Sequence, residues 1–128
     1  MKSIANLLTN IAPIFQALSA PARIEILMTI GQGEACVCHL ESRLGYRQAY
    51  ISQHLMALRQ VGLLDSRRDG KFIFYRLAIP GILELLQKAA QIVGGNLPEL
   101  GSFRLEKQCA CPICVPRIPN LAPLEHAY

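Results

Sequence analysis

Five cysteines are the residues of this chain best suited to chemistry, and they fall into two groups. Cys36 and Cys38 form a pair in the first half of the chain, and a C-terminal triplet consists of Cys109, Cys111 and Cys114. The chain has no apolar run of eighteen residues and no small-residue cleavage site near its start, which predicts a soluble, unexported, cytoplasmic protein without a membrane partner. Thiols stay reduced in that compartment and their number is odd, so we expect ligands or redox groups rather than a disulfide framework.

The stretch from Cys36 to Gly62 has the pattern of two helices joined by a tight turn. The first, from about Cys38 to Leu44, is followed by Gly45, which suits a left-handed helix cap. The second begins at Arg47, and its apolar residues recur at helical spacing, as Ile51, Leu55, Leu58 and Val61. The opposite side of that helix carries Ala49, Gln53, Met56 and Gln60. This arrangement predicts a helix-turn-helix, whose second helix enters the DNA major groove.

Residues 3 to 19 have the spacing of a helix or a pair of helices, with Pro13 at a start or a kink. The segment is more apolar than covering a single helix face requires, with Leu7, Leu8, Ile11, Ile14, Phe15 and Leu18. The excess indicates either a dimer contact or packing on the chain's own core. Pro21 then opens a second helix that runs to Gly31, and residues 31 to 34 are expected to form a turn.

After Gly62 the periodicity changes from helix to strand. Residues 63–66 and 71–77 have the composition of two short strands, and the bend is expected at residues 67–70, where Asp-Gly is a strong hairpin signal. Two strands that directly follow the DNA-reading helix, the second helix of the helix-turn-helix, form the β-hairpin known as a wing. Pro80 opens another helix over residues 82–93 that is apolar nearly all round, so we expect it to meet its copy in a symmetric dimer.

The net charge of +4 is concentrated in one part of the 128-residue chain. Between residues 47 and 76 six basic side chains stand against two acids, while the other segments balance. A phosphate-binding face has this charge pattern, as does an ordinary solvated basic surface. The chain is 52% hydrophobic and 17% charged, which is enough to bury one core. We assign residues 1–94 to a DNA-binding and dimerisation domain, and residues 95–128 to a loosely ordered tail rich in proline and cysteine.

Several of these blocks, in this order and spacing, resemble the ArsR/SmtB family of bacterial metal- and metalloid-responsive repressors. The resemblance covers about residues 15–86, in the segments ALSAPARIEIL, EACVCHL, GYRQAYISQHLMALRQVGLL and RRDGKFIFYRL. It implies a mainly α fold with a two-stranded β-wing, a winged helix-turn-helix that dimerises through its N- and C-terminal helices. It also implies a homodimeric repressor, not an enzyme, that binds double-stranded operator DNA with an inverted repeat and releases it when an ion binds.

The match of RQAYISQHL to the family's reading helix implies a set of residues at or near the DNA, namely Arg47, Gln48, Tyr50, Ser52, Gln53 and His54. Gln can bond an adenine edge through two hydrogen bonds, and the first turn of a helix offers amide donors to phosphate. For His54, packing within the protein is an equal alternative. Phosphate contacts from the wing, which contribute affinity rather than specificity, are expected from Arg67, Arg68 and Lys71.

The resemblance also assigns sensing to the cysteines, because the family's other site needs His and acidic ligands along the last helix, where residues 82–94 offer only Glu84. Cys36 and Cys38 match the family's cysteine pair at the start of the first motif helix. A helix start lowers a thiol pKa and favours binding of soft ions. Residues i and i+2 of an ideal helix point about 200° apart, so both thiols reach one ion only if Cys36 precedes the first turn or the turn distorts.

Two thiolates are too few for a tight site, and further ligands are available from Cys109, Cys111 and Cys114. We favour a mixed site in which tail cysteines of the same or the partner subunit join Cys36 and Cys38. The alternatives are a separate three-thiolate site in the tail, incidental tail cysteines, and a structural zinc clip. Three sulfurs suit arsenite or antimonite as the inducer, and four suit cadmium, lead or zinc. His39 is expected to be a partly exposed polar residue rather than a nitrogen ligand.

Two other functions fit parts of the sequence. With the same DNA-binding fold, thiols near a helix start could form a disulfide or polysulfide link and act as a redox or persulfide sensor. A thiolate metal carrier or small redox enzyme is a third possibility. No acid–base pair, Cys-x-x-Cys after a strand or phosphate-binding loop supports that third function.

Overall fold

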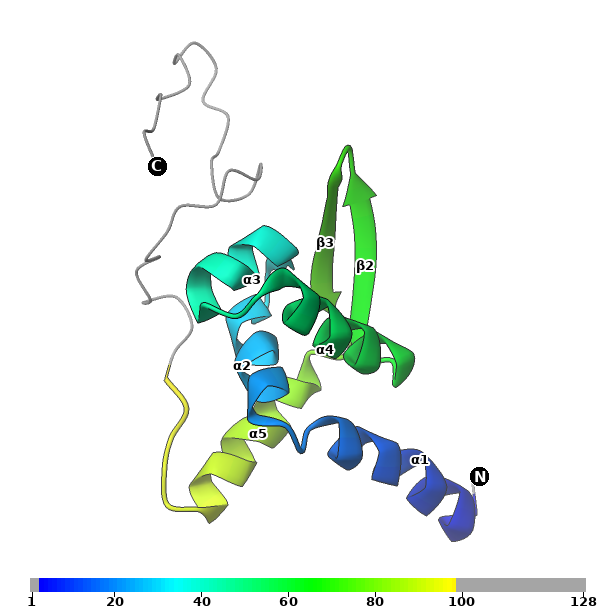
Figure 1. The fold of residues 1–128 in the computed structure, drawn as a ribbon. Helices are drawn as coiled ribbons and strands as arrows, with labels where there is room; N and C mark the ends of the chain where they lie inside the picture. The colour runs from blue at the N-terminus through cyan, green and yellow to red at the C-terminus, as the bar shows by residue number, and fades with distance from the viewer. Residues whose placement is uncertain (1–2, 99–128) are drawn as a thin grey trace.

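The computed structural model describes residues 3–98 of the chain, which form five helices and three strands (Figure 1). Their order is α1 (Ile4–Ala17), α2 (Pro21–Ile30), β1 (Glu34–Cys36), α3 (Val37–Leu44), α4 (Gln48–Gln60), β2 (Leu64–Asp69), β3 (Phe72–Leu77) and α5 (Gly81–Ile92). Most of the predicted tail, 95–128, lies outside the described residues, as do the tail cysteines Cys109, Cys111 and Cys114.

The predicted helix-turn-helix consists of α3 and α4, which lie one after the other across the top of α2 in Figure 1. Cys36 precedes α3 in an extended conformation, and its sulfur accepts a hydrogen bond from the backbone N–H of His39 at 3.3 Å. Gly45 ends α3 with a φ of 74°, the left-handed cap predicted for it. Arg47 then stands at the N-cap of α4, one residue before the helix.

The core joins α2, α3 and α4 to the sheet. On α4 the predicted apolar residues Ile51, Leu55 and Leu58 are all buried, whereas Gln53 and Met56 on the opposite side are exposed. Each such aliphatic side chain contributes about 1.5–3 kcal/mol when it is fully buried. This packing holds α4 with its polar side turned outward, and the predicted division of the helix is confirmed.

The sheet contains a strand that the sequence did not predict. Residues 31–34 were expected to form a turn, but Glu34 begins β1, which pairs antiparallel with β3 and places Cys36 opposite Phe74. The sheet order is β1-β3-β2, so β3 is the central strand. Three residues are too few to show an alternating pattern, and β1 is a strand because β3 supplies its hydrogen-bond partners.

The wing hairpin is longer than predicted. The bend was expected at residues 67–70, but β2 continues to Asp69, which pairs with Phe72, and the turn consists of Gly70 and Lys71. Gly70 has a φ of 61°, the positive value that a two-residue hairpin turn requires. Because the turn lies at Gly70 and Lys71 and not at the predicted residues 67–70, Arg67 lies within β2, opposite Phe74.

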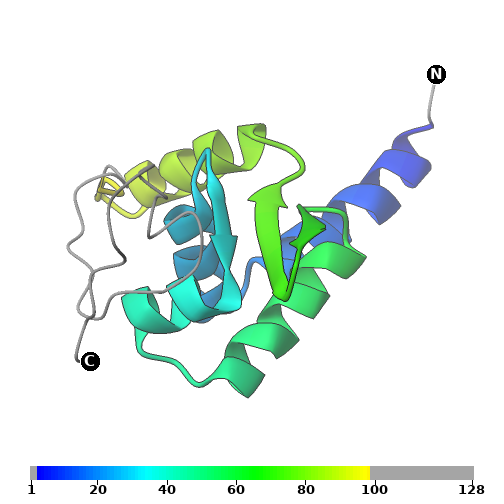
Figure 2. The same cartoon turned by 90° about the horizontal axis from the view of Figure 1, so that it is seen from above.

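Most of the exposed large apolar side chains of the described residues lie on the two terminal helices or directly after the second. α1 is one continuous helix with Pro13 inside it, and its N-terminal part projects away from the rest of the fold (Figures 1 and 2). α5 buries Ile82 and Leu86 but ends at Ile92, which is 84% exposed. No single described helix is long and apolar enough to span a membrane, and α1 with α2 meets that criterion only as a pair bent by 91°.

Candidate nucleic-acid interface and thiol site

The outward side of α4 brings together several residues predicted to contact DNA. Gln48 and Gln53 are exposed and Ser52 is half-buried, while Arg47 is exposed one residue before the helix. The Arg47 side chain makes no capping hydrogen bond to α4, so it leaves the first-turn amides available to an anion such as phosphate. The arrangement can offer amide donors to the DNA backbone and glutamine side chains to base edges.

His54 has a different environment from its neighbours on α4. Its Nδ1 accepts a hydrogen bond from Arg23 Nε of α2 at 3.0 Å, and its Nε2 is buried with no partner among the described residues. Burial lowers the pKa of His54, and the adjacent Arg23 charge lowers it further. The imidazole nitrogens are therefore directed into the protein, which favours the packing alternative for this residue.

Tyr50 belongs to an aromatic row that runs from Tyr46, in the segment before α4, through Tyr50 to His54 on α4. Its ring lies 5.1 Å from that of Tyr46 and 4.4 Å from that of His54, edge to face in the second case. Tyr46 is anchored in turn, because its hydroxyl donates to Glu25 Oε1 at 3.1 Å and this hydrogen bond raises the pKa of the phenol. Tyr50 is still 43% exposed, so it lies at the border between the row and the outward side of α4.

All three predicted phosphate contacts of the wing are exposed, and two of them, Arg68 and Lys71, make no ion pair among the described residues. Arg68 and Lys71 are exposed, and the Lys71 ammonium lies 5.4 Å from the centre of the Phe72 ring. Positive side chains near the tip of a wing can follow the phosphate backbone beside the groove that a reading helix enters.

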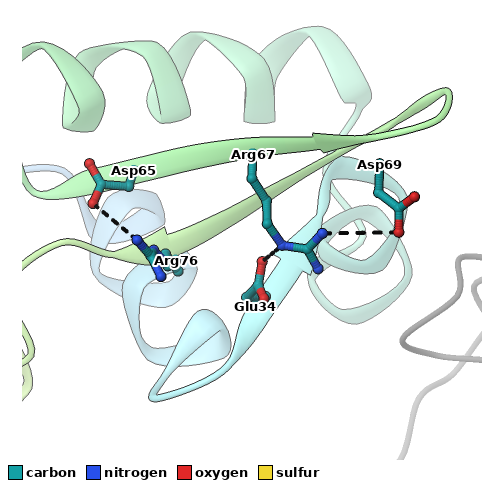
Figure 3. Close-up of polar contacts among 5 residues, drawn as sticks. All are labelled: Glu34, Asp65, Arg67, Asp69 and Arg76. Atoms are coloured by element: carbon teal, nitrogen blue, oxygen red, sulfur yellow. Dashed lines mark hydrogen bonds and ion pairs between the residues drawn. The ribbon is translucent and has the colours of Figure 1, made fainter.

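Arg67 is engaged within the protein (Figure 3). Its Nε donates to Glu34 Oε2 at 2.5 Å, its Nη1 lies 4.0 Å from Asp69 Oδ2, and its guanidinium lies 4.7 Å from the centre of the Phe74 ring. The hydrogen bond to Glu34 is the main cause that raises the pKa of Arg67. Water screens an ion pair between solvent-exposed side chains, so this pair is weak and leaves Arg67 able to contact a phosphate.

The two thiols lie where β1 meets α3. Cys36 is only 2% exposed and forms a small buried cluster with Phe74, and the half-buried Cys38 packs against this cluster. Cys36 is the N-cap of α3 and so precedes the first helical turn. This is one of the two geometries predicted to let both sulfurs reach one ion. His39 is half-buried, and burial, followed by the charge of Arg43, lowers its pKa.

Soft-ion chemistry fits the thiols, but the described residues do not complete a site. Within residues 3–98 no group of three or more His, Cys, Asp or Glu side chains is placed to hold a metal ion. Cys36 and Cys38 could supply two sulfur donors, and a third must come from elsewhere, such as the predicted tail cysteines.

Sequence reasoning missed the partners of these side chains. Arg23 and Glu25 on α2 hold the aromatic row of α4, and Glu34 on the unpredicted strand holds Arg67. The four-residue spacing of Tyr50 and His54 on α4 is a signal for the contact between these two rings. Nothing in the sequence indicates the partners of the row, because they depend on how α2 packs against α4.

Comparison with known proteins agrees with this geometry. Residues 20–66, which run from the start of α2 into β2, match the family model described as "Bacterial regulatory protein, arsR family". The biofilm growth-associated repressor of Xylella fastidiosa is 39% identical over 84 residues, which cover 66% of this chain and 68% of that protein. The chain belongs to the ArsR family. Its relatives are transcriptional regulators, so it is a DNA-binding regulator rather than an enzyme.

Two further relatives match over a shorter stretch. The biofilm growth-associated repressor of Agrobacterium fabrum is 46% identical over 70 residues, 55% of this chain and 60% of that protein. The arsenical resistance operon repressor of Escherichia coli is 41% identical over 66 residues, 51% of this chain and 56% of that protein. The chain therefore spans less than two thirds of the length of these two ArsR-family relatives.

Solved structures confirm the winged helix-turn-helix fold. The repressor BigR from Xylella fastidiosa matches with a TM-score of 0.63 and 32% identity, over 70% of this chain and 91% of that one. Reduced HlyU from Vibrio cholerae matches with a TM-score of 0.63 and 28% identity, over 70% and 97%. A homodimeric winged helix-turn-helix DNA-binding domain from Mycobacterium bovis matches with a TM-score of 0.61 and 32% identity, over 73% and 87%.

Proposed function

We propose that this ArsR-family chain is a homodimeric repressor that binds an inverted-repeat operator and releases it when a thiophilic ion binds its cysteines. The observation that carries the proposal is the position of Cys36. Its buried sulfur caps α3, the first helix of the helix-turn-helix, while its backbone pairs with Phe74 in β3, which is a strand of the wing. One thiol thus contacts both DNA-binding elements through its immediate neighbours.

The apolar side chains of the terminal helices support the dimer. α1 exposes a set of large apolar residues, namely Ile4, Leu7, Leu8, Ile11 and Phe15, and the end of α5 exposes Ile92 and Val93. A contiguous apolar face marks an interaction site, and two-fold symmetry would bring the same face of two chains together. One of the similar solved domains is homodimeric, which agrees with this use of the helices.

The same symmetry supports an inverted-repeat operator. Each chain of a two-fold dimer offers one outward side of α4, so the two sides read two half-sites of opposite direction, centred about 34–36 Å apart. Gln48 and Gln53 are the side chains best placed for base edges, and Arg68 and Lys71 for phosphates.

Ligand binding at Cys36 would act on α3 directly. When the Cys36 thiol becomes a ligand it loses its proton and forms a sulfur–ion bond, and the ion then sets the direction of the remaining sulfur electron pairs, which turns them away from the His39 N–H that the sulfur caps in the ion-free protein. Loss of a helix cap costs about 1 kcal/mol. Bringing Cys38 toward the same ion would further distort the first turn, and α3 packs against α4. The result would be a conformation that complements DNA less well.

The direction of the chain after α5 supports tail cysteines of the same subunit as further ligands. The Gly95 N–H donates to the Ala90 carbonyl at 2.9 Å, and the Leu97 N–H donates to Gln87 Oε1 at 2.9 Å. Leu97 packs against the core, so the chain turns back toward its own domain. From there an extended chain reaches up to about 40 Å by Cys109.

The ion is chosen by the number of sulfurs. Three thiolates suit arsenite or antimonite, the class of inducer that the name of the Escherichia coli relative favours. Four thiolates would suit cadmium, lead or zinc. A useful switch needs a coupling of about 3 kcal/mol, or about 150-fold, and operator DNA must weaken ion binding by the same factor.

The test uses reduced, metal-free full-length protein and labelled DNA from upstream of its own gene. Fluorescence anisotropy is followed while arsenite, cadmium, lead and zinc are added in separate titrations, with magnesium as the hard-ion control. Release at about one ion per site would support the proposal and name the inducer. Tight operator binding that none of these ions relieves would contradict the metal-sensing part of it.

A thiol-redox or persulfide switch on the same fold is the second candidate function. The match to HlyU, solved in a form described as reduced, favours it, as does the helix-start position of Cys36. In this case oxidant or polysulfide would release the DNA in the presence of a metal chelator, and dithiothreitol would restore binding.

A further inference from the structure

Three helices of the described chain meet at the side chain of Arg23. Its Nε donates to His54 Nδ1 on α4 at 3.0 Å, and its Nη1 donates to the carbonyl oxygen of Ala17 at 3.2 Å. Arg23 itself lies in the first turn of α2, and Ala17 is the last residue of α1. One half-buried guanidinium thus joins α1, α2 and α4.

The connection of α1 to the rest of the fold is otherwise confined to its last turns. Ala17 and the following Leu18 are buried and Ile14 is half-buried, whereas the more N-terminal side chains of α1 are exposed. α1 and α2 meet at a bend of 91°, and Arg23 bonds across this bend. The carbonyl groups at a helix C-terminus lack partners within the helix, and Arg23 supplies one to Ala17.

On α4 the bond from Arg23 continues into the aromatic row. His54 contacts Tyr50 edge to face, Tyr50 contacts Tyr46, and the Tyr46 hydroxyl donates to Glu25 of α2. The row is therefore attached to α2 at both ends. Ser52 and Gln53, which are predicted to face DNA, lie between Tyr50 and His54 in the sequence, so the row fixes how this part of α4 is rotated.

We propose that Arg23 is a positioning residue that makes the orientation of the reading helix depend on the placement of α1. The inference rests on the proposed function, in which α1 forms the dimer contact and α4 reads the operator. The guanidinium is planar with donors in fixed directions, so bonds to Ala17 and His54 hold α1 and α4 in one relative geometry. A dimer contact that fixes the position of α1 would thereby also fix the rotation of α4 about its axis.

This role predicts a particular loss when Arg23 is replaced. Arg23→Lys keeps the charge but cannot make both bonds in one plane, so α4 can rotate slightly about its axis within the limits that its buried side chains allow. Operator affinity should fall by about tenfold or more, because a base contact depends on side-chain direction. Affinity for an unrelated duplex and the salt dependence of binding should hardly change, because phosphate contacts remain.

The experiment first selects operator sites from random duplexes with the wild-type full-length protein. Operator and unrelated duplexes of equal length are then titrated by anisotropy with the wild type, Arg23→Lys and the matched control Arg76→Lys, whose side chain is 64% exposed on β3. Thermal denaturation and sedimentation are recorded for each. The expected result is a lower operator preference for Arg23→Lys alone, at a temperature where it is folded and dimeric.

His54→Phe provides a second route to the same test, because it keeps a ring against Tyr50 and removes the Nδ1 acceptor. It should lower operator preference like Arg23→Lys, and the double variant should lose little more than the larger single loss. An unchanged operator preference in Arg23→Lys or in His54→Phe, with only a lower melting temperature, would overturn the inference and leave a purely structural contact. If the wild type selects no sequence at all, the proposed function itself fails.

Discussion

The two helices of the helix-turn-helix begin in opposite ways. α3 begins behind Cys36, whose buried sulfur occupies the His39 amide, while α4 begins behind Arg47, which is exposed and makes no side-chain cap. The N-terminus of α3 is closed to solvent and carries a thiol sulfur, whereas the N-terminus of α4 leaves its backbone amides open to an anion. In the proposed repressor, sensing and DNA binding therefore both use a helix N-terminus. The N-terminus of α3 is buried and serves sensing, and that of α4 is exposed and serves DNA binding.

The largest expected effect comes from removing the sulfur at the closed start. Cys36→Ser keeps a capping oxygen but not a soft-ion ligand, so the protein should bind its operator normally and lose about 150-fold release by ion. Anisotropy with and without the inducing ion measures this change. Cys38→Ser should behave alike. Loss of DNA binding in either variant would mean that the cysteines are structural and not sensory.

The next largest effect is expected on the outward side of α4, the helix whose N-terminus is exposed. Gln53→Ala should weaken operator binding by about 1–3 kcal/mol, because a base contact with two hydrogen bonds is lost. Binding to unrelated DNA should not change. Gln60→Ala, at the exposed end of the same helix side, is the matched control. Equal losses on operator and unrelated DNA would contradict a base-reading role for Gln53.

A smaller effect separates the two helix starts in stability. Cys36→Ala removes the cap of α3 and part of a buried side chain, so the free energy of unfolding should fall by about 1–2 kcal/mol. Arg47→Ala removes no cap and should change it by less than about 0.5 kcal/mol. Urea denaturation of the reduced protein measures both. Similar losses in the two variants would remove the distinction between the starts.

The smallest effect is a dependence of stability on pH at the side of α4 that faces α2. Burial and Arg23 lower the pKa of His54 in the folded state, so the unfolded chain binds its proton more readily. The contribution is complete above pH 6.5 and is lost as pH falls from 6.5 through the folded pKa. His39 acts in the same direction. In urea denaturation between pH 5 and 8, His54→Gln should show a weaker pH dependence than the wild type, and an equal one would exclude His54.

Much of the fold could be predicted because it follows from local pattern. The helical spacing of Ile51, Leu55 and Leu58 sets the buried side of α4, and Gly45 takes the left-handed cap that its lack of a β-carbon permits. Strand β1 was not predicted, and the predicted position of the wing turn was wrong. A three-residue strand has no periodicity of its own, and the polar residues Arg67 to Asp69 fit a turn as well as an exposed strand.

The sequence by itself determined the winged helix-turn-helix, the apolar terminal helices and the family, because helix and hairpin signals are local and their order is specific. Only the tertiary structure decided the partners of the site residues. It placed Arg67 on Glu34, His54 on Arg23 and the Cys36 sulfur against Phe74. Such contacts join residues about 30 or more positions apart, and their geometry depends on how whole elements pack, which no local pattern encodes.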